Sequence, residues 1–308
     1  MEIAVTVNQM LVLFFVLAVG FAARKLKIMT EATDKLLSKL VVNIAVPCTI
    51  IIAITDGGGD IPKSQAALFL LISLAVYAIA LLLSFAVPAA MRASRRRMGD
   101  DGLISFMTAF GNVAFMGFPV CQAIFGDRAL FYVAMFNIPF TLLVYSVGIV
   151  MVSGRHGKFD PKILINPSLI SAVAAIVLFA TGARLPGVVS GGIDIISRMT
   201  TPSAMLIIGS SLAAVSPKAV FAERRLYYLA LMKLAVIPAA TWLIMRCFIT
   251  DPLVLGVLTA LSGMPSATSA PMLAFEYGGN AQLASGGVFI TTLLSVATIP
   301  LLIQILAV

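Results

Sequence analysis

Charged side chains are scarce in this sequence: they make up 11% of its 308 residues, whereas 60% of the residues are hydrophobic. Acidic residues are the scarcest charged type, with 13 Asp and Glu against 21 Lys and Arg. Such a composition excludes an ordinary soluble domain, and apolar runs of about 20 residues recur along the chain. The sequence therefore predicts an all-α polytopic protein of the lipid bilayer.

Cysteine and histidine are almost absent as well, with three Cys and one His. Cys48, Cys121 and Cys247 are scattered within apolar runs without a CxxC motif, and His156 lies in a loop. This pattern supports neither a disulfide framework nor a metal site. No Ser/His or paired-carboxylate arrangement indicates an enzyme. We predict no catalytic residue, no metal and no cofactor, apart from a Na⁺ or H⁺ that could be coupled to transport.

The apolar runs predict ten membrane spans. The first run lacks a basic leader and a cleavage site, so we interpret it as a retained span. The spans lie near residues 3–23, 36–54, 66–90, 102–126, 129–152, 164–182, 192–214, 226–247, 252–276 and 284–307.

Basic residues are concentrated in every second connection between these spans. The odd-numbered connections carry about three times as many as the even-numbered ones, which places the odd connections in the cytoplasm and both termini outside. This role in topology also explains the net charge of +8 without a nucleic-acid partner. The residues of the odd connections are Arg24, Lys25, Lys27, Lys35, Lys39, Arg92, Arg95, Arg96, Arg97, Arg155, Lys158, Lys162, Lys218, Arg224 and Arg225.

The two halves of the chain resemble each other. "GFPVCQAIFGDRA" at 117–129 matches "SAPMLAFEYGGNA" at 269–281, which aligns Pro119 with Pro271. Pro47 aligns with Pro202 at a similar offset. Because each half holds five spans, an odd number, the second copy must be inverted in the membrane. We predict two inverted five-helix repeats, 1–155 and 160–308, an architecture typical of secondary transporters.

The fourth and ninth predicted spans are interrupted at corresponding places. "GNVAFMGFP" at 111–119 and "GMPSATSAP" at 263–271 bring Gly and Pro to about the middle of each span, where both residues disfavour a helix. Kinks are the alternative interpretation, but two matched interruptions favour a binding site. The predicted crossover and hinge residues are Gly111, Gly117, Pro119, Gly263, Pro265, Pro271 and Pro47. We expect Pro119 and Pro271 to begin new half-helices, with Ser269 as a cap.

Uncharged polar residues in these interruptions could bind an anion. The amide of Asn112 can donate two hydrogen bonds to a carboxylate, although it could instead cap the broken backbone. The same two roles are open for Ser266, Thr268 and Ser269. Asn43 and Asn137 interrupt other spans and are second candidates, because a buried Asn often only bonds to a neighbouring helix.

Three segments, "GNVAFMGFPV", "MPSATSAPMLAFEYGGNAQLASGGVFITTLLSVATIPLL" and "TPSAMLIIGSSLA", resemble the auxin efflux carrier family, which includes plant PIN carriers and bacterial malate/malonate-type permeases. The resemblance implies ten helices, of which 1, 2, 6 and 7 form a dimerising scaffold. Helices 3–5 and 8–10 would form a mobile transport unit in which the broken helices four and nine cross. It also implies a bacterial cytoplasmic (inner) membrane location and a homodimer.

The resemblance is incomplete at the crossover. Plant carriers have Pro followed by Asn in the first broken helix, and Pro followed by Gln in the second. This chain has Gly111 before Asn112 and Pro265 before Ser266. The connection between spans five and six is also short. We therefore expect an organic-anion substrate without carrying over specificity for indole acetate.

The sequence gives little indication of which ion, if any, is coupled to transport. The acidic residues lie in loops or near span ends, with Glu276 closest to a span interior, which disfavours cation/proton exchange. Lys233 lies inside the eighth span. It could snorkel to the interface or could serve in gating or charge balance, as could Glu276.

These observations favour a carrier that moves a small carboxylate by elevator-like alternating access, driven by an ion gradient or by the membrane potential. A sodium- or proton-coupled symporter of the bile-acid-transporter-like type remains an alternative, as does an anion channel. The inverted repeat favours a carrier, because a channel would more commonly show re-entrant filters or oligomeric rings.

Overall fold

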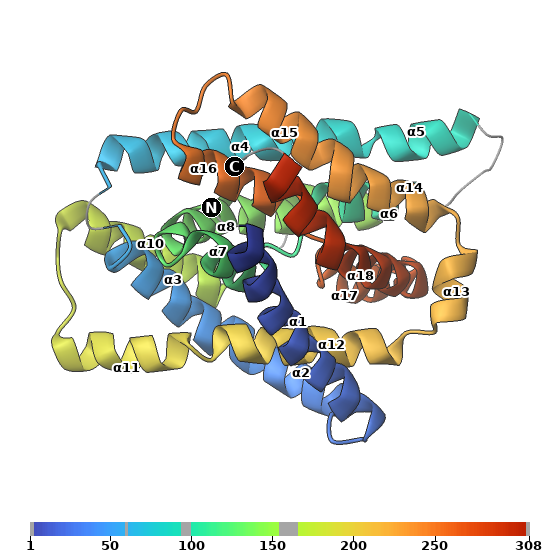
Figure 1. Ribbon diagram of the computed structural model, residues 1–308, viewed down its shortest axis with the longest axis horizontal. Helices are drawn as coiled ribbons and strands as arrows, with labels where there is room; N and C mark the ends of the chain where they lie inside the picture. Colours follow the sequence, from blue (N-terminus) through green and yellow to red (C-terminus); the bar gives the residue numbers. More distant parts are fainter. Residues whose placement is uncertain (1–2, 59–60, 94–99, 154–165, 306–308) are drawn as a thin grey trace. The chain divides into compact units, whose positions relative to one another are not determined.

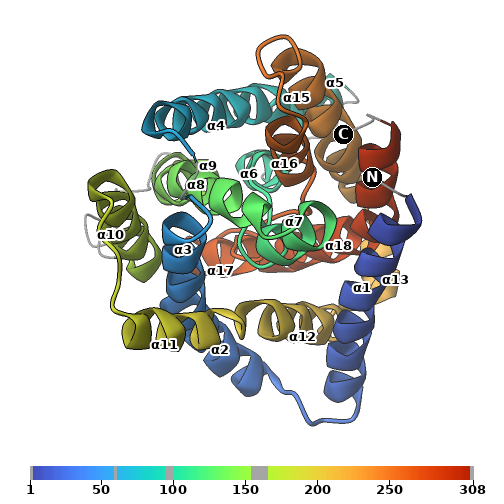
Figure 2. The same cartoon turned by 60° about the vertical axis from the view of Figure 1, so that its left-hand side comes forward.

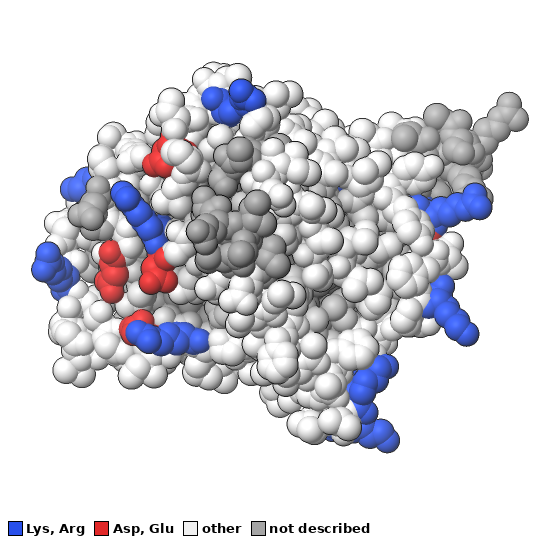
Figure 3. All heavy atoms as spheres, viewed as in Figure 1, with Lys and Arg blue, Asp and Glu red and all other residues white. Residues whose placement is uncertain are grey.

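The apolar runs fold into helices, and the computed structural model contains no strand among the residues that it describes, which are 3–58, 61–93, 100–153 and 166–305 (Figure 1). Six described helices are long and apolar enough to cross a membrane: Asn8–Lys25, Glu31–Thr55, Lys63–Ala89, Arg128–Ser153, Arg225–Met245 and Ala281–Ile305. Most of the face in Figure 3 carries neither acidic nor basic side chains. The prediction of an all-α, membrane-spanning class is confirmed at this level.

Some predictions concern residues outside the described part of the chain. These are the basic residues Arg95, Arg96, Arg97, Arg155, Lys158 and Lys162, together with His156 and the boundary between the predicted repeats. The predicted ten-helix inverted repeat, its domain limits and its topology stay predictions.

The helices group into two compact units. Unit 1 comprises residues 1–71, 114–139 and 161–214, and unit 2 comprises residues 72–113, 140–160 and 215–308. Each unit therefore draws segments from both halves of the sequence.

Unit 1 is held together by a close helix crossing. Its helices, with π-helical segments marked η, are α1 (Ile3–Lys25), α2 (Glu31–Leu40), η1 (Val41–Ala45), α3 (Val46–Thr55), the start of α4 (Lys63–Ser84), α7 (Gly117–Phe125), most of α8 (Arg128–Leu143), α10 (Pro167–Thr181), α11 (Gly187–Ser197) and α12 (Thr200–Ala214). α1 and α12 lie side by side (Figures 1 and 2). A Cβ atom on Gly20 would lie 2.3 Å from the Leu206 oxygen, and one on Gly209 would lie 1.9 Å from the Leu17 oxygen. Glycine at both positions lets the two backbones touch.

Polar contacts reinforce unit 1. Arg24 pairs with Asp34 at 3.1 Å, and the Asp34 carboxylate also accepts a hydrogen bond from Ser210 at 2.8 Å, which ties α1, α2 and α12 together. The hydroxyls of Thr49 and Thr200 lie 2.8 Å apart. Each of these threonines is two residues from a proline that the predicted repeat aligns, so a segment of the first half of the chain meets one of the second half here.

One predicted span is interrupted where the sequence analysis expected a single helix. Residues 192–214 contain the end of α11 and all of α12, with Arg198 and Met199 between them. Pro202 is the physical reason: it has no N–H to donate to the carbonyl of Arg198, and its ring would collide with that carbonyl in a continuous helix.

Unit 2 contains the remaining helices, which surround the crossing described below. They are the rest of α4, α5 (Ala86–Ala93), α6 (Asp101–Ala109), the end of α8, η2 (Val144–Gly148), α9 (Ile149–Ser153), α13 (Pro217–Ala222), α14 (Arg225–Leu231), η5 (Met232–Val236), α15 (Ile237–Met245), α16 (Pro252–Ser262), α17 (Ala270–Glu276) and α18 (Ala281–Ile305). α17 packs along α18, and α14 and η5 also contact α18.

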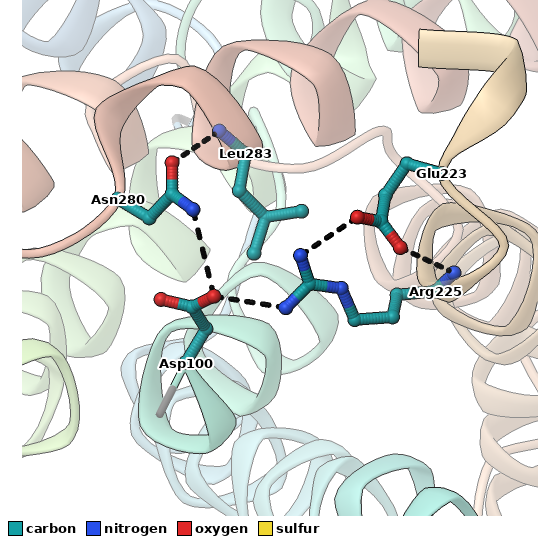
Figure 4. Close-up of polar contacts among 5 residues, drawn as sticks. All are labelled: Asp100, Glu223, Arg225, Asn280 and Leu283. Carbon is teal, nitrogen blue, oxygen red and sulfur yellow. Dashed lines mark hydrogen bonds and ion pairs between the residues drawn. The ribbon is translucent and has the colours of Figure 1, made fainter. Parts of the chain in front are cut away.

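An ionic network at the helix starts stabilises unit 2 (Figure 4). Arg225 donates to Asp100 at 2.8 Å and to Glu223 at 2.7 Å. Asn280 donates to the same Asp100 oxygen at 3.5 Å, while its own oxygen accepts from the Leu283 N–H at 3.0 Å. The network joins the N-terminal ends of α6, α14 and α18. Negative carboxylates are favourable at such ends, because free N–H groups give them partial positive charge.

Candidate functional site at the paired interruptions

Both predicted helix interruptions are present, and in unit 2 their first residues pair with each other. The chain leaves helical geometry after Ala109 and again after Ser262. Gly111 and Ser266 form an antiparallel bridge. The Asn112 N–H donates to the Pro265 oxygen at 2.7 Å, and the Ala267 N–H donates to the Phe110 oxygen at 3.0 Å. Each interruption thus satisfies backbone groups that the other leaves free, as the interior of a membrane protein requires.

The C-terminal end of α6 receives two further donors from distant parts of the sequence. The Ser266 hydroxyl donates to the Met107 oxygen at 2.9 Å, and the Lys233 ammonium donates to the Ala109 oxygen at 3.4 Å. The last carbonyls of a helix have no partner within it and carry partial negative charge. The hydroxyl and the ammonium therefore cap α6 in the way that its geometry and its dipole favour.

A threonine that the sequence analysis did not single out holds the second interruption. The Ser266 N–H donates to the hydroxyl of Thr291 at 3.1 Å, and that hydroxyl donates to the Gly287 oxygen at 2.6 Å. Thr291 thereby fastens the bridge to α18. Its only sequence signal is a pair of threonines within an otherwise apolar run.

Lys233 is buried, with 1% of its surface exposed. The interpretation that it snorkels to the interface is therefore wrong. Its segment, η5, is π-helical, and single π turns are frequent at functional sites. The missing side chain of Gly111 makes room for the ammonium, because a Cβ atom there would lie 3.2 Å from Nζ. The sequence position, about two turns into a span, did not reveal that the side chain points toward the end of α6.

The predicted site residues divide between the two units. Asn112, at 3% exposure, Ser266, Thr268, Ser269, Gly111, Gly263, Pro265, Pro271, Lys233 and Glu276 belong to unit 2. Asn43, Pro47, Gly117, Pro119 and Asn137 belong to unit 1.

Two of the candidate amides donate to their own helices. The exposed Asn43 donates to the Lys39 oxygen at 2.7 Å, and the buried Asn137 donates to the Val133 oxygen at 2.9 Å. Thr268 and Ser269 are half-buried, and Glu276 is exposed at the end of α17. Substrate binding by these residues stays a prediction.

The prolines lie near the starts of the following half-helices, as expected, but not all at the first position. Pro271 is the second residue of α17, whereas Pro119 is the third residue of α7. Both fall in the first helical turn, where a missing N–H costs no intrahelical bond. Ser269 occupies the N-cap position without a side-chain capping bond.

Removing the Ser266 hydroxyl should weaken the bridge. We expect Ser266→Ala to destabilise the protein by about 1–3 kcal/mol, because the buried Met107 oxygen loses the donor that replaces water. The measurement is the thermal unfolding midpoint in detergent. Ser285→Ala is the matched control, since the one bond of the Ser285 hydroxyl to a described residue is to the Ala281 oxygen in its own helix, at 2.9 Å. An equal shift in both variants would contradict a role for Ser266 in holding the crossing.

The site offers donors and a cation in a buried setting. Elsewhere in unit 2, the buried hydroxyls of Thr241 on α15 and Thr292 on α18 have no hydrogen-bond partner among the described residues. Within that same part of the chain, no group of three or more His, Cys, Asp or Glu could hold a metal ion. The chemistry of the available groups suits recognition of a small anion.

Comparison with known proteins places the chain in a family. The sequence profile described as "Membrane transport protein" matches residues 5–303. An uncharacterized transporter of Methanocaldococcus jannaschii is 26% identical and aligns over 96% of this chain and 97% of its own length. A Rhizobium meliloti protein named "Putative malonate transporter" is 26% identical over 75% of this chain and 74% of its own length. An uncharacterized transporter of Escherichia coli is 22% identical, with 97% of each chain aligned. The chain therefore belongs to the membrane transport protein family, the auxin efflux carrier family that its sequence resembles.

Proposed function

We propose that this transporter moves a small organic anion, a carboxylate, across the bacterial cytoplasmic membrane by elevator-like alternating access. The observation that carries the proposal is the bridge between the two interruptions, with two buried donors beside it in unit 2: Asn112, which follows Gly111 in the chain, and Lys233, whose ammonium would lie 3.2 Å from a Cβ atom on Gly111. An amide and an ammonium are donors that orient and neutralise a carboxylate. The name of the Rhizobium relative points to the same substrate class.

We propose ten spans in two inverted repeats, with both termini outside. A dimerising scaffold would be formed by helices 1, 2, 6 and 7, and a moving unit by helices 3–5 and 8–10. The meeting of Gly111 with Ser266, and of Thr49 with Thr200, supports the repeat, because each contact joins segments of the two halves near aligned prolines. Inverted repeats with broken helices are typical of carriers with a central binding site.

The substrate screen comes first. Purified protein in liposomes is tested on a solid-supported membrane with mono- and dicarboxylates, with and without a Na⁺ gradient and a pH gradient. We expect saturable currents for at least one carboxylate, together with faster uptake when the same anion is present on the opposite side. Absence of any response to the carboxylates would contradict the proposed function, and uptake that does not saturate would indicate a channel.

Asn112 provides the residue-level test. We expect Asn112→Ala to reduce the apparent affinity for the transported carboxylate by about tenfold, the loss of one charge-assisted hydrogen bond worth about 1.5 kcal/mol. Asn43→Ala should change it less than twofold, because the Asn43 amide is exposed and donates to its own helix. Expression and elution volume serve as folding controls. Equal losses in the two variants would remove Asn112 from the site.

A further inference from the structure

Within the described part of the chain, no carboxylate balances the charge of Lys233. Lys233 is the only Lys, Arg, Asp or Glu among the described residues whose side chain is buried, and no ion pair among them includes it. Burying an unpaired ion costs several kcal/mol. Its one hydrogen bond to another described residue is to the Ala109 oxygen, at the end of α6. A helix end supplies about half an elementary charge, so part of the lysine charge is left uncompensated.

The elements packed against η5 supply no better partner. These elements are α6, α14, α15 and α18, and neither α15 nor α18 contains a titratable residue. Asp101 on α6 lies eight residues before Ala109, about 12 Å along the helix. On α14, Arg225 is occupied by Asp100 and Glu223, and Tyr227 and Tyr228 are exposed.

We infer that Lys233 is the counter-ion of the transported anion and that, as the one buried cation among the described residues, it restricts the cargo to a single negative charge. The inference rests on the proposed function and adds the charge of the substrate to it. One carboxylate neutralises one ammonium. A second carboxylate in this interior would have no cation beside it, and the free energy of burying its charge would be unfavourable. A dicarboxylic acid is therefore bound in its singly protonated form.

Anion binding in this arrangement does not require a sodium ion. In a carrier that binds Na⁺ together with an anion, the metal contributes the positive charge. Here the lysine already contributes that charge beside the crossing and occupies the carbonyl oxygen that a cation would use. Anion binding should accordingly be as strong in choline buffer as in sodium buffer.

The experiment compares malonate with its monomethyl ester, which has nearly the same shape but carries one negative charge at every pH above its single pKa. Binding to the purified protein is measured by calorimetry between pH 5 and 8 in choline buffer, and repeated in sodium buffer. The variants are Lys233→Met, Lys233→Arg and, as control, Lys218→Met, which removes an exposed lysine of unit 2.

The expected result has three parts. Wild-type protein binds the monoester with an affinity that does not depend on Na⁺ and that changes less with pH than its affinity for malonate, which rises at least tenfold as the pH falls and the monoanion forms. Lys233→Met loses at least tenfold in monoester affinity, while Lys233→Arg keeps part of it. Lys218→Met binds like the wild type.

Several outcomes would overturn the inference. One is monoester binding by Lys233→Met at the wild-type affinity, and another is malonate binding that stays equally tight where malonate is a dianion. A requirement for Na⁺ would show that the positive charge comes from outside. If Lys233→Met does not fold, the wild-type pH and sodium measurements decide alone. A wild-type protein that binds and transports no carboxylate contradicts the proposed function, whereas one that transports carboxylates without regard to their charge contradicts only the inference.

Discussion

Alanine in place of Gly209 is expected to lower the thermal unfolding midpoint by roughly 5–10 °C, the effect of about 3 kcal/mol of overpacking. The new Cβ atom would lie 1.9 Å from the Leu17 oxygen and 2.8 Å from the Phe21 nitrogen. Both atoms belong to the backbone of α1, so no side-chain rotation can relieve the collision. α1 and α12 must separate, and the packing of small residues between them is lost.

Gly192→Ala is the matched control for this measurement. Gly192 lies within α11, and a Cβ atom there would meet nothing within 4 Å. Because alanine favours a helix over glycine by about 1 kcal/mol, this variant should unfold at the wild-type temperature or slightly above it. Detergent-solubilised protein followed by intrinsic fluorescence or light scattering provides the midpoints. A Gly209→Ala variant as stable as the control would show that the two helices do not touch as described.

Valine in place of Gly111 is expected to abolish most carboxylate transport, by about tenfold or more, while leaving a folded protein. Its Cβ atom would lie 3.2 Å from the Lys233 ammonium and 3.3 Å from both the Met264 side chain and the Met264 oxygen. The two methyl groups beyond Cβ have no room on this side. They displace the ammonium or push the two interruptions apart, and either change removes donors from the predicted site at a cost of about 1.4 kcal/mol or more.

The measurement is initial uptake into liposomes at equal amounts of reconstituted protein. Gly191→Val, at an open position of α11, tests whether valine at a glycine is harmful in itself. Gly111→Ala should fall between wild type and Gly111→Val, since its contacts require shifts of only a few tenths of an ångström. Full activity of Gly111→Val would mean that the space beside Lys233 is not needed for transport.

Local chemistry made the interruptions predictable. Glycine and proline act on the backbone of their own turn, so "GNVAFMGFP" and "GMPSATSAP" indicated where helices would end without knowledge of the fold. The span at 192–214 is an exception: it is predicted as one helix, although Pro202 disfavours a continuous helix through Arg198 by the same chemistry.

Contacts between distant residues were beyond the sequence analysis. The alignment of the two halves related Pro119 to Pro271, but nothing in it indicated that Gly111 would pair with Ser266 or that Ser266 would bond to Met107. The direction of the Lys233 side chain was equally hidden, because it depends on a π turn and on an approaching helix end. Asn112 was predictable as a functional candidate, because placing an amide inside the membrane costs free energy and polar residues there usually have a function.

The bridge between the two interruptions is made by main-chain atoms, apart from the hydroxyl of Ser266. Main-chain pairing does not depend on which side chains the paired residues carry, so mutations at neighbouring positions other than Gly111 and Ser266 can change what the predicted site recognises while the crossing is kept. Relatives that share only a quarter of their residues could thus keep one framework while diverging in cargo. During evolution, the crossing can therefore be kept while the transported substrate changes.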